Sequence, residues 1–106
     1  GRGIGPALEA KDVLAVLQNE RDAPEDLRER ALILSGHVLE MSALAPEGQG
    51  RKLAQKILEG GQAWKKFLAI CEAQGGLREP LRARFAQTVV ARTGGIVTAV
   101  DNRKLA

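Results

Sequence analysis

The sequence between Asp22 and Leu44 constrains the fold more than any other part of the chain, because it predicts a helix that is apolar on two sides. Apolar residues recur there at intervals of four, three, four and three, which is the period of one helix face: Leu27, Ala31, Leu34, Val38 and Met41. A second apolar face is formed by Leu32, Ile33, Leu39 and Ala43. A helix of this kind needs other elements to cover it from both directions.

The start and the middle of this helix carry further signals. Asp22 followed by Glu25 is the pattern of a capping box, and Pro24 is expected in the first turn, where its missing N–H removes no hydrogen bond. Gly36 weakens the helix by ~1 kcal/mol relative to alanine. We therefore expect the backbone of a neighbouring element to approach closely at Gly36.

Three more helices are predicted. One begins at Pro6 after a glycine-rich loop, another ends at Gly60-Gly61, and the last ends at Gly75-Gly76. Their apolar positions are Ala10, Val13, Leu14 and Leu17 in the first, Leu53, Ala54, Ile57 and Leu58 in the next, and Trp64, Phe67, Leu68 and Cys71 in the last.

The character of the sequence changes after Gly76. Residues 87–91 and 96–100 are rich in Val, Thr and Ile, and they flank a turn of hairpin length at residues 92–95. The predicted fold is mainly α, with four helices in residues 1–76, a charged linker in 77–85 and a C-terminal β-hairpin in 86–106 that leads to a helix capped by Asp101. Because an isolated hairpin is marginal in water, it should pack on the helices, on a second copy or on further sheet.

Composition limits the classes of function. The 106 residues suffice for one small domain, and the 44% of hydrophobic residues allow a packed core. The net charge of +3 is too small to predict binding to nucleic acid or to a membrane. A single cysteine, Cys71, excludes an internal disulfide and a multi-cysteine metal site, which favours a cytoplasmic protein. The chain begins without Met, and we expect it to be a segment of a longer protein.

The glycines before the first helix are the first candidate site. Gly1, Gly3 and Gly5 precede a helix N-terminus, where phosphate groups are favoured. The dinucleotide fingerprint needs a preceding strand and a further glycine, and the chain has Leu8 at that position. Loop geometry is the preferred interpretation of these glycines.

Two further candidates are isolated residues. His37 and Glu40 lie one turn apart on the central helix and would form half of a metal site or an acid–base pair. No further ligands accompany them, so we interpret them as polar helix positions. Cys71 is interpreted as a small buried hydrophobe rather than a nucleophile.

Basic residues and a strand-like motif complete the candidates. The basic residues alternate with core positions, which favours a solvated face over a nucleic-acid interface: Arg51, Lys52, Lys56, Lys65, Lys66, Arg78, Arg82 and Arg84. Residues 95–100 resemble a strand of biotinyl- and lipoyl-type domains, but the adjacent turn offers Arg92 and no lysine to carry the group. The residues alone therefore predict no catalytic, substrate-binding or metal-binding residue and no cofactor.

The order of short motifs along the whole chain resembles the thymidine phosphorylase and pyrimidine-nucleoside phosphorylase family. The motifs are the glycine–arginine loop and Ala-Leu-Glu run of residues 1–10, then Gly61, Ala63 and Phe67 before residues 72–76, and Gly94-Gly95-Ile96-Val97 before Asp101-Asn102. The resemblance is greatest to the branch that holds archaeal AMP phosphorylases and bacterial proteins of thymidine phosphorylase type. Pro6 stands where many members have Asn, so thymidine, uridine and AMP all remain open as substrates.

The resemblance implies an enzyme in which phosphate, the co-substrate, attacks the anomeric carbon of a nucleoside in a cleft between a small helical domain and a larger α/β domain. A β-rich domain would follow. The family's phosphate and base contacts lie before Gly1, so the chain would act as an inactive scaffold. Its expected partners are the rest of the longer chain and a second copy, without nucleic acid or membrane. The alternative is a stand-alone helical interaction module.

Overall fold

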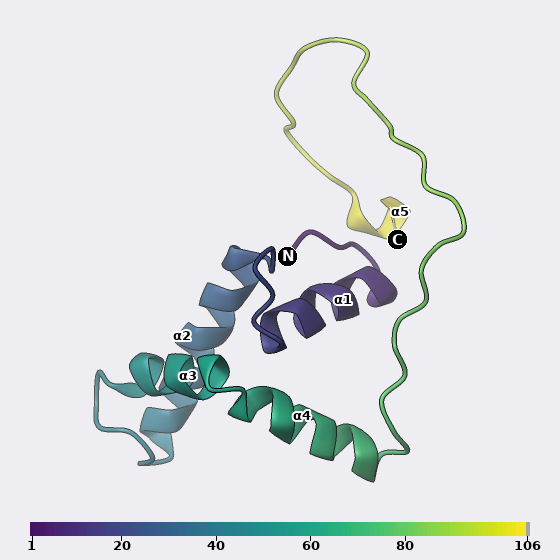
Figure 1. Ribbon diagram of the computed structural model, residues 1–106. Helices are drawn as coiled ribbons and strands as arrows, with labels where there is room; N and C mark the ends of the chain where they lie inside the picture. The colour runs from purple at the N-terminus through teal and green to yellow at the C-terminus, as the bar shows by residue number, and fades with distance from the viewer. Residues whose placement is uncertain (106) are drawn as a thin grey trace.

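The computed structural model describes residues 1–105, and within them it contains five helices. These are α1 (Pro6–Leu17), α2 (Glu25–Met41), α3 (Gly50–Glu59), α4 (Gln62–Ala73) and the single turn α5 (Asn102–Leu105). Figure 1 shows α3 crossing α2, α4 continuing away from that crossing, and a long arc that joins α4 to α5. The four longer helices occupy the part of the chain where helices were predicted.

The predicted β-hairpin is wrong. No strand occurs among residues 1–105, and residues 87–91 and 96–100 belong to the extended arc between α4 and α5 (Figure 1). Their apolar side chains are exposed, with 90% of Val89 and 92% of Ile96 open to solvent. The physical reason is that β-propensity depends on having a surface to pack against, and the arc has none. The arc ends at Asp101, whose Oδ1 accepts a hydrogen bond from the backbone N–H of Arg103 at 3.1 Å.

The crossing of α2 and α3 brings two backbones into direct contact. A Cβ atom added at Gly36 would lie 2.6 Å from the backbone nitrogen of Arg51 and 2.8 Å from its Cα. Gly50, the first residue of α3, packs against the backbone of Gly36 in the same way. The close approach predicted at Gly36 is confirmed, and it requires glycine on both helices.

The start of α2 differs from the prediction. Pro24 occupies the N-cap position, with φ −65° and ψ 114°, and no side chain caps the helix, so the capping box of Asp22 and Glu25 does not form. The backbone carbonyl of Pro24 accepts a hydrogen bond from the N–H of Arg28 at 3.1 Å, which begins the helical ladder. Pro24 is buried, and its ring fixes the φ angle that the chain needs at this point.

The core is small and lies where α1, α2 and α3 meet. It consists of Val16, Leu32, Ala54 and Leu58, each 4–6% exposed. The buried residues of α1 are Asp12, Ala15 and Val16. Of the predicted stripe of Ala10, Val13, Leu14 and Leu17, Leu17 packs against the core, whereas Val13 is exposed. Only the side of α2 that carries Leu32 is covered, because Leu34, Val38 and Met41 are 61%, 63% and 88% exposed. Within the described residues, the expected cover on both sides of α2 is therefore absent.

We predict that Gly36→Ala destabilises the protein by about 2 kcal/mol. The new methyl group meets the backbone of α3, which cannot rotate away as a side chain can, and this overpacking outweighs the gain in helix propensity. Urea unfolding followed by circular dichroism measures the change. Ser35→Ala, at the adjacent exposed position of α2, is the control and should be neutral or slightly stabilising. A Gly36→Ala protein as stable as the control would contradict the contact.

Candidate functional site

The glycine-rich loop before α1 is closed on a carboxylate of its own chain. The Oδ2 atom of Asp12 accepts hydrogen bonds from the backbone N–H groups of Arg2, at 2.5 Å, and Gly3, at 2.8 Å. A Cβ atom at Gly3 would lie 2.5 Å from the backbone carbon of Leu8, so the loop packs tightly on α1. The N–H groups that were candidates for cradling phosphate therefore already hold an anion.

Asp12 is the residue of this loop that the sequence interpretation missed. It is a charged residue on the buried face of α1, 8% exposed, and an acidic residue in such a place needs hydrogen-bond partners. The backbone N–H groups of Gly3 and Arg2 lower the pKa of its carboxyl group below the ordinary value of 3.8. The one available signal was an acidic residue next to the apolar positions of a predicted helix.

The structure does not bring His37 and Glu40 together as a pair that shares a ligand or a hydrogen bond. The Oε1 atom of Glu40 accepts a hydrogen bond of 2.7 Å from the backbone N–H of Gly50. This N–H lies at the start of α3, where the backbone donors have no partner within the helix. His37 is exposed, and both residues border a hollow of about 230 Å³ together with Ile33, Gly36 and Arg51. Among residues 1–105, no group of three or more His, Cys, Asp or Glu side chains is arranged to hold a metal ion.

The candidate basic residues are spread over the surface. Arg51 binds Glu29 through two hydrogen bonds, Nε to Oε1 at 2.9 Å and Nη2 to Oε2 at 2.6 Å, and this contact raises the pKa of Arg51 and lowers that of Glu29. Lys65 and Lys66 are exposed on α4. The three predicted arginines of the arc are exposed as well: Arg78, Arg82 and Arg84. The exposure of these basic residues agrees with the prediction that they form a solvated face.

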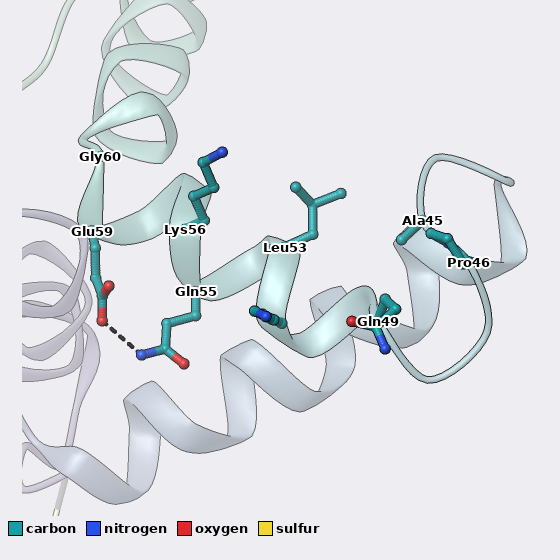
Figure 2. Close-up of a pocket in the computed structure, with 9 residues that line it drawn as sticks. Ala45, Pro46, Gln49, Leu53, Gln55, Lys56, Glu59 and Gly60 are labelled. Atoms are coloured by element: carbon teal, nitrogen blue, oxygen red, sulfur yellow. Dashed lines mark hydrogen bonds between the residues drawn. The ribbon is translucent and has the colours of Figure 1, made fainter.

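A further hollow lies along α3 (Figure 2). It has a volume of about 860 Å³ and extends from Ala45 and Pro46 at one end to Glu59 and Gly60 at the other. The dashed line in Figure 2 marks the hydrogen bond from Gln55 Nε2 to Glu59 Oε1, 2.8 Å long. The charged residues of its lining are Lys52, Lys56 and Glu59, and the lining contains no Ser, Thr, Cys or His. Glu59 accepts hydrogen bonds from Arg28 and Gln55, so its carboxylate is held by neighbouring side chains.

The fourth helix carries two of the three aromatic residues, Trp64 and Phe67, and the cysteine. The rings of Trp64 and Phe67 stack, with their centroids 5.7 Å apart and their planes 21° from parallel. Cys71 follows one turn after Phe67 and is half-buried, so it is not the buried residue that was predicted. None of the helices that the structure describes has the length and apolar character needed to cross a membrane.

Comparisons with known proteins give consistent matches over the whole chain. A protein of Legionella pneumophila subsp. pneumophila named "Putative thymidine phosphorylase" is 62% identical over 106 residues, which make up 100% of this chain and 20% of that protein. "Putative thymidine phosphorylase 1" of Cupriavidus necator is 61% identical over the same extent. A protein of Parvibaculum lavamentivorans with the name "Putative thymidine phosphorylase" is 54% identical over 105 residues, 99% of this chain and 21% of that protein. No family model matches the chain. The chain spans about one fifth of the length of these relatives.

We predict that Asp12→Asn lowers the free energy of unfolding by about 2 kcal/mol at neutral pH, because the loop N–H groups lose a charged acceptor. The lowered pKa of Asp12 means that its stabilising contribution is present above the unfolded-state pKa and is lost as the pH falls through the folded-state value. The difference between the native and variant proteins should therefore shrink below about pH 4. Urea unfolding at several pH values measures it, with the exposed Asp22→Asn as control. A difference that is independent of pH would contradict the ionised contact.

We predict that Glu40→Ala destabilises the protein by about 1 kcal/mol, because the N–H of the buried Gly50 loses its acceptor. Glu40→Gln keeps an oxygen at this position and should recover most of the loss. Thermal unfolding of the two variants separates the two roles of the residue. If Gln is as damaging as Ala, the negative charge of Glu40 matters rather than its capping of α3.

Proposed function

We propose that the chain is a structural segment of an enzyme of the thymidine phosphorylase type, which cleaves nucleosides with phosphate. The observation that carries the proposal is the 54–62% identity over the whole chain to proteins named "Putative thymidine phosphorylase" that are about five times longer. The motif order noted in the sequence supports the same assignment.

The way in which the chain uses its charged groups supports a structural role. Four contacts of charged side chains join two elements of the fold. Asp12 joins α1 to the loop before it, and Glu40 joins α2 to the start of α3. Glu29 and Arg28 of α2 bind Arg51 and Glu59 of α3, respectively. A carboxylate or guanidinium group that joins two elements in this way fixes the position of one element relative to the other. These residues therefore serve the fold, and the proposed site for phosphate and nucleoside is built by other parts of the longer protein.

In the proposed reaction, an oxygen of phosphate attacks the anomeric carbon of the nucleoside. A bond from that carbon to phosphate oxygen forms as the bond to the base nitrogen breaks, so the products are sugar 1-phosphate and the free base, which takes up a proton. Cationic and hydroxyl donors are needed around the phosphate to stabilise the charge. Phosphate is the co-substrate, and we propose no cofactor.

We propose thymidine as the substrate, because the names of the relatives include thymidine phosphorylase. AMP is the alternative, in line with the other branch that the motifs resemble. We further propose a cytoplasmic enzyme whose two copies associate, as is common for soluble oligomers.

The test compares a full-length protein that contains these residues with the 106-residue chain alone. We predict that the full-length protein releases thymine from thymidine only when phosphate is present, and that the isolated chain shows no turnover. Uridine and AMP, supplied in parallel, identify the preferred substrate. A full-length protein inactive on all three would overturn the proposed reaction, and turnover by the isolated chain would overturn the structural role.

A further inference from the structure

An apolar groove lies on the uncovered side of α2, next to the core. It is formed by α1, α2, α3 and the beginning of α4 and has a volume of about 460 Å³. Its floor includes the core residues Leu32 and Leu58, and its α2 wall includes Leu34 and Val38, one turn apart. The groove is thus continuous with the hydrophobic core and opens it to the outside.

The chemistry of the lining defines what fits the groove. Of its 12 residues, 11 are apolar, and Ser35 is the one polar residue. Leu34 and Val38 are 61% and 63% exposed, although residues of this type gain free energy when they leave water. With no charged group in its lining, the groove suits an uncharged, apolar chain segment and offers no partner to a charged ligand.

We propose that this groove is filled by an apolar segment of the same polypeptide that lies outside these 106 residues. This inference rests on the proposed function, in which the chain is one segment of a longer protein. In the relatives, about four fifths of the length lies outside the region that matches this chain, so ample chain exists to supply the segment. None of residues 77–101, which follow α4, lines the groove.

A tethered segment has a physical advantage over a second copy of the protein. Covalent attachment gives a segment an effective concentration of roughly millimolar, which a separate molecule at ordinary concentrations does not reach. A second copy would have to insert an exposed apolar element of its own, such as the arc that carries Val89 and Ile96, and it lacks the advantage of covalent attachment. The occupant is therefore part of the same polypeptide.

The test measures how fast cysteines in the full-length protein react with a maleimide. Val38→Cys is placed in the groove wall and Arg30→Cys at an exposed position of the same helix, both in a Cys71→Ser background. We expect native Val38→Cys to react at least roughly tenfold more slowly than Arg30→Cys, and both to react alike in denaturant. Leu34→Cys repeats the measurement if Val38→Cys fails to fold.

Each outcome decides the proposal. Slow reaction that is unchanged on dilution of the protein supports a segment of the same polypeptide. Protection that disappears on dilution identifies a second copy and overturns it, and reaction as fast as that of Arg30→Cys shows an empty groove and also overturns it. The labelling does not require turnover, so a protein that is protected but inactive on nucleosides refutes the proposed reaction and leaves the groove assignment standing.

Discussion

The contact between the backbones of Gly36 and Gly50 sets the position of α3 on α2, and the polar contacts at the start of α3 depend on it. Once α3 begins at that point, the N–H of Gly50 faces Glu40, which caps it. The next residue, Arg51, lies within reach of Glu29 on the same side of α2. A side chain at either glycine would separate the helices and remove the cap and the ion pair together.

Asp12 and Asn19 have hydrogen-bond partners that could not be predicted from the sequence. Asp12 holds the backbone of the loop before α1, so a feature typical of phosphate binding is occupied by an internal carboxylate. Asn19 donates a hydrogen bond of 2.8 Å to the carbonyl of Leu58 and joins the end of α1 to α3. Asp12 and Asn19 thus lie at junctions between elements, where each of them satisfies backbone groups.

The hydrophobic core is one-sided, and this connects the fold to its proposed role. The buried cluster around Leu32 and Leu58 fills the space between α1, α2 and α3, while the neighbouring face of α2 stays open. Small domains bury a limited fraction of their surface, and a core of this size gives modest stability. In the proposed longer protein, an apolar segment from outside these 106 residues would complete the core.

The sequence by itself determined the four longer helices, the glycine pairs that follow α3 and α4, and the need for a close approach at Gly36. Helix period and helix breaking depend on residues within a few positions of each other. Only the tertiary structure decided which face of α1 is buried, that Asp12 and Glu40 bind backbone ten residues away, and that residues 87–100 form no hairpin. These features depend on which surfaces meet after the chain folds back on itself. That information is spread over distant residues, and a local pattern does not contain it.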